Sequence, residues 1–482
     1  MSSGSASTGA MYIDGQWVPS SDGQLIELTN PATEETIGTV PAAAPSDVDR
    51  ALEAAERGWK VWRETGAWER TAVMRRAAEL LRSRCTSIAR TLTEEQGKPI
   101  SEAEWEVRAS ADQFDWFADE ARRIYGRTID GHNRQTRLFV MKEPIGPVAA
   151  FSAWNFPALL PARKLAPAIA AGCSVVLKPA REAPRSAFAL AEACHDAGLP
   201  AGVVNILTGE SAAISSRLIA SDVIRKVSLT GSIPVGQELL RLCAENVKPA
   251  SMELGGHAPA LVFRDADLDS AVEACVLGKF RNAGQVCSSA SRFYVDEPIF
   301  EQFVGRFVDR VRRLKVGPGL DPTTEVGPMA NERRLENIEA LVQDAMDRGA
   351  DLRLGGHRSP HFSRGLYFEP TVLTDVENTM ELMRVEPFGP VAPITVMSGL
   401  EDGLEKANAT PYGLTGYVFT RDLRTAFLAA EGLEVGLVGV NNVVIATAEA
   451  PFGGVKQSGF GRESGAEGIE DYTVSKYVNM LL

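Results

Sequence analysis

The sequence predicts an α/β protein built on a doubly wound, largely parallel sheet. From about Gly146 onward, short apolar strands alternate with helical stretches, and a second strand–helix series with a different rhythm runs from 292 to about 440. Such alternation is typical of parallel sheets covered by helices on both faces. The chain has 482 residues, more than one hydrophobic core holds, so two or three domains are expected.

The composition argues against several classes of binding partner and indicates where the protein resides. The formal net charge is −13, from 50 basic and 63 acidic residues, which disfavours nucleic acid as a partner. Apolar runs are broken before membrane-spanning length, and residues 1–10 are small and polar, which predicts a disordered tail. The six cysteines stand singly, without CxxC spacing or a histidine in a ligand pattern. We therefore expect a cytoplasmic protein without a metal site.

The first part of the chain predicts short strands followed by helices. A strand-and-turn region spans about 12–45, and helical spacing of apolar residues begins after Asp47, which has the residue type of an N-cap. Further amphipathic helices are predicted over about 69–95 and 101–125. The stretch 127–143 then predicts a β-ribbon with its turn near Asp130-Gly131.

Five apolar stretches predict the strands of the first strand–helix series: 147–152, 174–177, 203–207, 226–229 and 258–263. Near the end of the chain, 472–480 predicts a strand with an apolar face. Such a strand is expected to pair with another element or with another subunit.

The run Trp154-Asn155-Phe156-Pro157 directly follows the first of these strands. Open α/β sheets bind their ligands at the carboxyl ends of the strands. Asn155 is then the N-cap of the next helix, with Pro157 opening that helix, or an amide that stabilises a developing alkoxide. The two roles are compatible.

Two other strand ends carry groups suited to a nucleotide. Lys178 follows a buried strand and is either a surface charge that ends the strand or a contact for cofactor hydroxyls or phosphate. The run Leu229-Thr230-Gly231-Ser232 passes from a strand through glycine into a helix. Free N–H groups and the helix dipole at such a junction suit a pyrophosphate, although a plain tight turn has the same residues.

Glu253 lies between apolar neighbours and is followed by two glycines. Burial favours the protonated carboxyl and brings its pKa toward the working range of a general base. The alternative is a glutamate bonded to neighbouring backbone amides.

Cys287 follows the helix-stop residues Asn282 and Gly284, in irregular backbone where a thiol is accessible. The other cysteines lack that placement, and ordinary packing is the alternative interpretation. Further along, two prolines and a glycine in Glu386-Pro-Phe388-Gly-Pro predict a rigid loop that presents Glu386 and Phe388, with a plain loop as the alternative.

Taken in order, the motifs WNFP, KP, LTGS, ELGG, GQVC and EPFGP resemble the aldehyde dehydrogenase superfamily. The resemblance covers nearly all of the chain after about Met11 and includes a late motif, PFGGVKQSG, at 451–459. It implies a doubly wound nucleotide-binding domain at 11–126 and 147–254, an α/β catalytic domain at 255–455, and a small oligomerisation β-ribbon at 127–146 and 470–482. A homodimer or homotetramer is the expected assembly.

The resemblance also implies roles for the matching residues. It makes Cys287 the nucleophile, Glu253 the base that activates water, and Asn155 the oxyanion donor, assisted by the backbone N–H of Cys287. The implied reaction oxidises an aldehyde to a carboxylic acid through a thiohemiacetal and a thioester, with NAD or NADP as hydride acceptor. The residues on cofactor-contact positions are Trp154, Lys178, Gly231, Ser232, Leu254, Glu386 and Phe388.

Two other functions compete with this interpretation. A CoA-acylating dehydrogenase of the same fold passes its thioester to CoA, but it does not need the base that Glu253 provides. A non-catalytic binding protein is the second alternative, since a fold alone never guarantees activity. The presence of Cys287, Glu253 and Asn155 together argues against it.

The expected substrate is a short semialdehyde with a distal carboxylate, succinate semialdehyde first. The run KFRNAGQ at 279–285 and the pair Arg163-Lys164 resemble the succinate-semialdehyde dehydrogenase branch, where Arg163 and Arg281 would hold the carboxylate. Ser289 departs from that branch, which often has a second cysteine there, as do Ala446 and Thr447, where it has serines. The runs WFADE at 116–120 and MELGGH at 252–257 are also similar to α-ketoglutaric-semialdehyde dehydrogenases.

Cofactor choice is predicted from Arg181. Many NAD-preferring relatives have a glutamate three residues after the lysine of the KP motif, where it binds the ribose hydroxyls. Here Arg181 stands at that position, and it can pair with a 2′-phosphate but cannot accept a hydrogen bond. We therefore predict good use of NADP. The alternative is that Glu182 turns inward and restores a preference for NAD.

Overall fold

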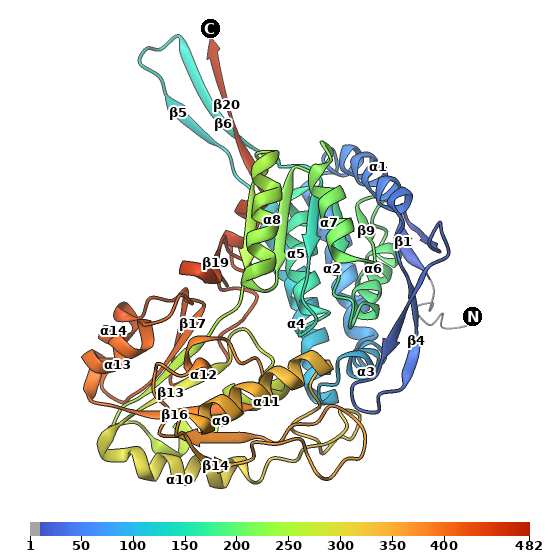
Figure 1. The fold of residues 1–482 in the computed structure, drawn as a ribbon. Coiled ribbons are helices and arrows are strands. Elements are labelled where there is room, and N and C mark those ends of the chain that lie inside the picture. The colour runs from blue at the N-terminus through green and yellow to red at the C-terminus, as the bar shows by residue number, and fades with distance from the viewer. Residues whose placement is uncertain (1–9) are drawn as a thin grey trace.

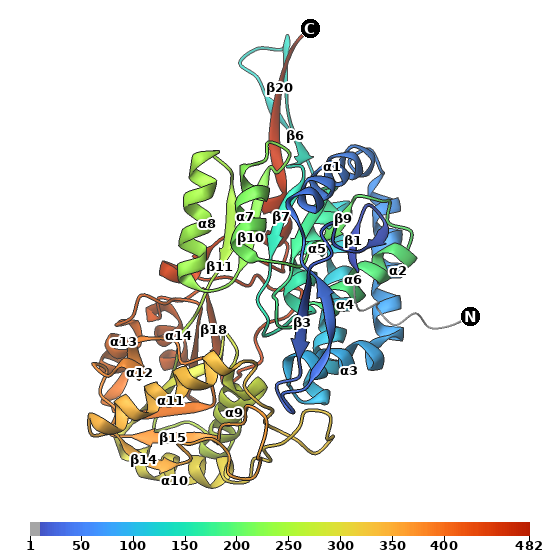
Figure 2. The ribbon, with the colours of Figure 1, turned by 45° about the vertical axis from the view of Figure 1, so that its right-hand side comes forward.

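The computed structural model describes residues 10–482 and contains two open α/β sheets, with a narrow third sheet projecting from the first (Figures 1 and 2). The tail predicted over 1–10 lies outside the described residues, Ala10 excepted. This arrangement confirms the predicted α/β class.

The first sheet has eight strands in the described chain, in the order β19-β11-β10-β7-β8-β9-β1-β2. The five strands from β11 to β9 are parallel, and β19 and β1 add antiparallel edges. The bounds are β1 (Met11–Ile13), β2 (Gln16–Val18), β7 (Val148–Phe151), β8 (Val175–Lys178), β9 (Val204–Ile206), β10 (Lys226–Thr230), β11 (Ala250–Glu253) and β19 (Gly459–Phe460).

Helices cover both faces of the first sheet, because successive strand residues point to opposite sides. Val148 and Ala150 join one core, whereas Ala149 and Phe151 join another. The covering helices are α1 (Pro45–Trp62), α2 (Ala67–Ser83), α3 (Cys85–Gln96), α4 (Ile100–Glu120), α5 (Leu159–Ala171), α6 (Arg185–Asp196), α7 (Ser211–Ala220) and α8 (Ile233–Glu245).

The second sheet has the order β14-β15-β16-β13-β12-β17-β18 and is parallel apart from β14. Its strands are β12 (Ala258–Val262), β13 (Ala290–Asp296), β14 (Asp351–Leu354), β15 (Thr371–Thr374), β16 (Val391–Met397), β17 (Thr415–Phe419) and β18 (Leu437–Val440). Its helices are α9 (Leu268–Phe280), α10 (Phe300–Val311), α11 (Glu332–Asp347), α12 (Glu381–Arg384), α13 (Gly399–Asn408) and α14 (Leu423–Gly432).

The third sheet joins the predicted ribbon to the C-terminal strand. β6 (Thr136–Pro144) pairs with β5 (Arg127–Asp130) on one side and with β20 (Thr473–Leu481) on the other, both antiparallel. It projects from the first sheet (Figure 1). The prediction that 472–480 pairs with another element is confirmed. A separate hairpin, β3 (Leu25–Thr29) with β4 (Thr36–Pro41), completes the strands of the N-terminal region.

Three local predictions were wrong. The stretch 258–263, assigned to the first strand–helix series, forms β12 of the second sheet, and the unpredicted β11 takes the place beside β10. The search for apolar runs did not predict β11, because this strand has only four residues and two of them, Ser251 and Glu253, are polar. Asp47 is not the N-cap of α1 but the third helical residue, and its carboxylate accepts a hydrogen bond from the backbone N–H of Ala44, the true N-cap. The helix predicted over 69–95 is two helices, broken at Arg84.

Candidate active site

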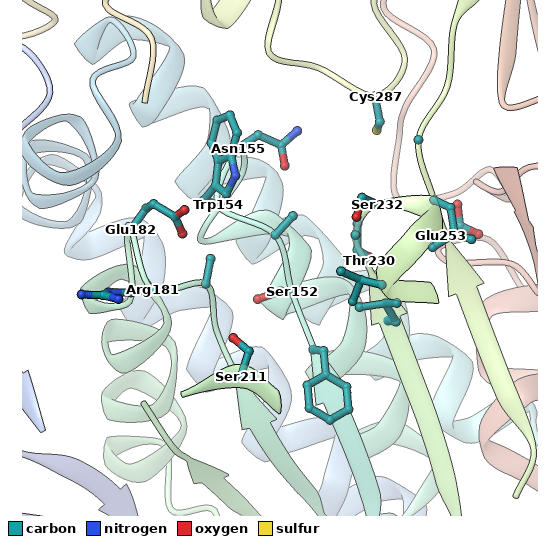
Figure 3. A pocket seen from close by; sticks show the side chains of 18 of the residues that line it. Ser152, Trp154, Asn155, Arg181, Glu182, Ser211, Thr230, Ser232, Glu253 and Cys287 are labelled. Atoms are coloured by element: carbon teal, nitrogen blue, oxygen red, sulfur yellow. The ribbon is translucent and has the colours of Figure 1, made fainter. Parts of the chain in front are cut away.

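A cavity of about 400 Å³ lies at the carboxyl ends of β7, β8, β10 and β11. Figure 3 shows the Cys287 side chain entering it opposite the strand ends that carry Asn155 and Glu253. Open α/β sheets bind ligands at this edge. The cavity brings together most of the residues singled out in the sequence, namely Trp154, Asn155, Lys178, Arg181, Gly231, Ser232, Glu253, Leu254, Cys287, Glu386 and Phe388.

Cys287 is held by a turn with unusual backbone geometry. Asn282, Ala283 and Gly284 follow α9 with φ of 50°, 52° and 70°, all in the left-handed region. Gly284 is required there, because a Cβ would lie 2.1 Å from the carbonyl oxygen of Gly389. Cys287 is partly exposed, whereas the other five cysteines are buried. The predicted placement just past a helix end is confirmed.

The Cys287 thiol holds its proton tightly. Burial, together with the carboxylates of Glu386 and Glu253, raises the pKa of Cys287 to about 12, although Arg163 opposes them. The thiolate is the nucleophilic form of cysteine, so the thiol must lose its proton before it can react. Arg163 is the nearby charge that favours the thiolate.

Glu253 ends β11 and is buried, with no hydrogen-bond partner for either carboxylate oxygen among the described residues. The alternative of a carboxylate bonded to neighbouring amides is therefore wrong. Burial, and then the nearby Glu463, raises the pKa of Glu253 well above the usual carboxyl range, as predicted from its neighbours. A carboxylate in this condition is a strong proton acceptor.

A buried ion pair that the sequence analysis missed lies behind Glu253. Lys164 Nζ is 2.7 Å from Glu463 Oε1 and donates to Ser228 Oγ at 3.2 Å. The partners of this pair are 299 residues apart, so no local pattern connects them. The available signal was a pair of basic residues, Arg163 and Lys164, in the otherwise apolar α5.

Asn155 is not the N-cap of α5, which begins at Leu159 after Ala158. Glu106 caps that helix instead, accepting hydrogen bonds from Ala158 N at 2.8 Å and Leu159 N at 3.1 Å. The Asn155 side chain is therefore free for another task. Its Nδ2 donates to the carbonyl oxygen of Gln285 at 3.1 Å, which places the amide beside the turn that carries Cys287.

The opposite end of the cavity fits a dinucleotide. Lys178 is buried, and its Nζ donates to Ser211 Oγ at 2.6 Å, so it is not a surface charge. Ser232 is the N-cap of α8, and no described side chain caps the free N–H groups of that helix, which suit a pyrophosphate. Ser152 Oγ and Thr230 Oγ1 are buried and have no hydrogen-bond partner in the described chain. These groups are the ones a bound nucleotide would satisfy.

Glu386 and Phe388 lie on the opposing wall, contributed by the second sheet. Glu386 Oε1 accepts a hydrogen bond from Gly256 N at 3.1 Å, and burial raises the pKa of Glu386 to about 7 against the opposing charges of Arg334 and Lys279. Phe388 adopts φ of 50° and packs edge-to-face on Trp154, with ring centroids 5.3 Å apart. The loop is therefore tightly constrained, as its prolines predicted.

Arg181 lies at the exposed rim of the cavity. Its guanidinium points away from the other labelled side chains in Figure 3. Glu182 Oε1 accepts a hydrogen bond from Asn331 Nδ2 at 3.4 Å. Arg181 thus points outward in this structure, which is the arrangement that the sequence analysis gave as the alternative.

Arg163 and Arg281 do not line this cavity. Arg163, on α5, lines a second cavity of about 470 Å³ that is also bounded by Trp105, Trp116 and Thr447. Arg163 is 3 % exposed and stacks 4.4 Å from the ring of Phe452. Arg281 does not line the second cavity, but its guanidinium lies 5.5 Å from the ring of Trp105, which does.

Neither arginine forms an ion pair at bonding distance with a described residue, although the charge of Arg163 acts on Glu253 and that of Arg281 acts on Glu102. Neither the Arg163 nor the Arg281 side chain donates a hydrogen bond to another described residue, and Arg163 Nε is buried without a partner. A buried guanidinium without a counter-ion is costly unless a ligand supplies one. The Arg163 guanidinium is therefore the group in this cavity that suits an anion, although four acidic residues also line it, namely Asp112, Asp115, Asp119 and Glu449.

The sheet edge, the nucleotide-compatible corner and the cysteine together define a dinucleotide-dependent oxidoreductase of the α/β class. The model of the aldehyde dehydrogenase family matches residues 17–478. A glutarate-semialdehyde dehydrogenase of Pseudomonas putida is 44% identical over 467 residues, 97% of this chain and 96% of that protein. An NADP(+) succinate-semialdehyde dehydrogenase of Escherichia coli is 43% identical over 466 residues, covering 97% and 96%.

The solved structures agree with the sequence comparisons. The succinate-semialdehyde dehydrogenase of Burkholderia pseudomallei has a TM-score of 0.98 at 41% identity, covering 100% of both chains. The chain belongs to the aldehyde dehydrogenase family, and it is an aldehyde dehydrogenase that uses a nicotinamide dinucleotide. Across residues 10–482, no helix combines the length and apolar character needed to cross a membrane.

Proposed function

We propose that the protein oxidises a short aldehyde with a distal carboxylate to the corresponding acid, through a covalent intermediate on Cys287. The observation that carries the proposal is one cavity that holds a partly exposed cysteine, an unpartnered buried carboxylate and a side-chain amide. An aldehyde carbon becomes a good hydride donor only after it is tetrahedral, which is what addition of a thiol achieves.

In the first half of the reaction, Cys287 gives up its proton to solvent and its thiolate Sγ adds to the aldehyde carbon. Asn155 Nδ2 and the backbone N–H of Cys287 stabilise the resulting oxyanion. The bound dinucleotide supplies the hydride acceptor. In the second half, Glu253 takes a proton from water, whose oxygen attacks the thioester and releases the acid and the thiol. The raised pKa of Glu253 suits this proton transfer, and the presence of this base favours hydrolysis over transfer to CoA.

The distal carboxylate of the substrate is proposed to bind Arg163 and Arg281. Support comes from the unpartnered guanidinium of Arg163 and from the semialdehyde dehydrogenases to which this chain is similar. Succinate semialdehyde is the first candidate, with glutarate and α-ketoglutarate semialdehydes as alternatives.

A panel of these three semialdehydes and butanal tests the substrate proposal. We expect kcat/KM to be higher for a semialdehyde than for butanal. Arg163→Met should lower the ratio of kcat/KM for the semialdehyde to kcat/KM for butanal by roughly 30-fold or more, the loss typical of a buried charge pair. The ratio is used because Arg163 also acts on the pKa of Cys287. Arg108→Met, which removes an arginine already paired with Glu104, is the matched control. Equal kcat/KM for butanal and the semialdehydes in the wild type would contradict the proposal.

We further propose that NADP is used well, because Lys178 and Arg181 provide positive charge at the corner beside Ser211. Arg181→Glu is expected to shift the ratio of kcat/KM for NADP over NAD toward NAD by about tenfold or more. The measurement is a pair of cofactor titrations on each variant, and Arg333→Glu is a second exposed charge change on the same rim for comparison. A strong NAD preference in the wild type, or an unchanged ratio in Arg181→Glu, would refute the role of Arg181.

We also propose a division into domains, with nucleotide binding at 11–126 and 147–254, catalysis at 255–455, and oligomerisation by the ribbon formed by 127–146 and 470–482. β20 is paired on one edge only and exposes Tyr477, Met480 and Leu481. Native proteins cover such an edge, so we propose a homodimer or homotetramer joined through this strand. Light scattering at micromolar concentration is expected to give at least twice the 51.9 kDa mass of one chain, and a monomeric mass would contradict the assignment.

A further inference from the structure

The end of α3 and the loop that joins it to α4, namely Gln96, Gly97, Lys98 and Pro99, have no role in the reaction described above. Lys98 is nevertheless fully buried. Its Nζ lies 2.6 Å from Glu106 Oε2, donates to the backbone oxygen of Asn155 at 2.7 Å, and sits 4.0 Å from the ring of Phe156. A buried ammonium group is costly unless it is fully paired, so each of these contacts restrains it.

The loop packs closely against Gly319 and Gly327 in the second half of the chain. Ile100 N donates to the carbonyl oxygen of Gly319 at 2.8 Å. A Cβ on Gly319 would lie 2.3 Å from the carbonyl oxygen of Lys98, and one on Gly327 would lie 2.3 Å from that of Gly97. Two glycines are therefore needed for the second half of the chain to approach this loop.

The same loop also holds the turn that precedes Cys287. Gln96 Nε2 donates to Asn282 Oδ1 at 3.0 Å, and Asn282 Nδ2 donates to the Asn155 backbone oxygen at 3.0 Å. That one oxygen thus accepts hydrogen bonds from Lys98 and from Asn282. The backbone of the proposed oxyanion donor is therefore hydrogen-bonded both to the loop and to the turn that carries the nucleophile.

We propose that Lys98 is a positioning residue that fixes the Asn155 amide relative to Cys287, acting through the backbone of Asn155. The proposal rests on the function proposed above for Asn155 and Cys287. Glu106 contributes to the same restraint, because its second oxygen caps α5 and so fixes the segment that follows Asn155. Misplacement of a catalytic group by about 1 Å costs roughly 100-fold in rate, so a restraint at this point has a large effect.

Lys98→Met tests the proposal, since methionine is similar in length and cannot donate. We expect the burst of reduced dinucleotide with succinate semialdehyde to slow by roughly 100-fold, while dinucleotide affinity and the rate of Cys287 alkylation by iodoacetamide stay within about threefold. Alkylation displaces iodide from carbon and forms no oxyanion, so it does not need Asn155. Arg264→Met, which breaks a half-buried ion pair with Asp296 away from both cavities, is the control and should leave all three quantities unchanged. An unchanged burst, or an equal fall in all three quantities, would overturn the proposal.

Gln96→Leu provides a second variant if Lys98→Met does not fold, because it removes the bond to Asn282 without leaving a buried charge. The same selective slowing of the burst is expected, to a smaller extent. A double-mutant cycle with Asn155→Ala separates the two proposals. If Asn155→Ala leaves the burst unchanged, the proposed role of Asn155 fails. If Asn155→Ala slows the burst but Lys98→Met slows it further by its full single-mutant factor, only the inference about Lys98 fails.

Discussion

Cys287→Ala is expected to abolish aldehyde oxidation while leaving dinucleotide binding intact. A nucleophile removed from a covalent mechanism typically costs a factor of about 10⁴ or more in kcat, and no other described cysteine is even partly exposed. Dinucleotide binding should survive, because Lys178, Ser211 and the start of α8 lie at the other end of the cavity.

The measurements are steady-state oxidation of succinate semialdehyde and a fluorescence titration with NADP. Cys194→Ala is the matched control, because Cys194 is buried on α6, away from the cavities described. Activity above a few percent of wild type in Cys287→Ala, after exclusion of contaminating enzyme, would remove Cys287 from the mechanism.

Glu253→Gln is expected to separate the two halves of the reaction. Removal of a general base costs about 10²–10⁴ in the step it serves, so steady-state turnover should fall by that factor. A burst of reduced dinucleotide should remain, because hydride transfer precedes hydrolysis of the thioester. Intact-mass spectrometry should then show the acyl group accumulated on Cys287, and absence of both burst and adduct would assign Glu253 to the first half instead.

The pH dependence of turnover gives an independent check on Glu253. The base acts in its deprotonated form, and burial and Glu463 raise its pKa. The rate of thioester hydrolysis should therefore rise with pH over a range above that of an ordinary carboxyl group. In Glu253→Gln that rise should disappear, leaving only the slow reaction with water or hydroxide.

The fold class and many residues of the candidate site could be predicted from local sequence patterns. Apolar strands alternating with helices predicted the α/β class because burial imposes those periods on the chain. Strand-end motifs placed Lys178, Ser232 and Glu253 at one sheet edge, because parallel strands deliver their carboxyl ends to the same side. Helix-stop residues before Cys287 predicted its irregular, accessible backbone, and the order of the motifs led to the family that the comparisons show.

Other features were decided only by the tertiary structure. The apolar pattern alone did not reveal which sheet receives 258–263, because a buried apolar strand has the same pattern in either sheet; only the family resemblance assigned it to the catalytic domain. Arg163 and Lys164 are neighbours in the chain, yet one lines the second cavity and the other pairs with Glu463, because consecutive helix residues point about 100° apart. The contacts of Lys98 with Glu106 and Asn155 likewise join segments that meet only in the fold. Hydrophobic periodicity reports whether a residue is buried, but the partner of a buried charge is set by where distant segments come to lie.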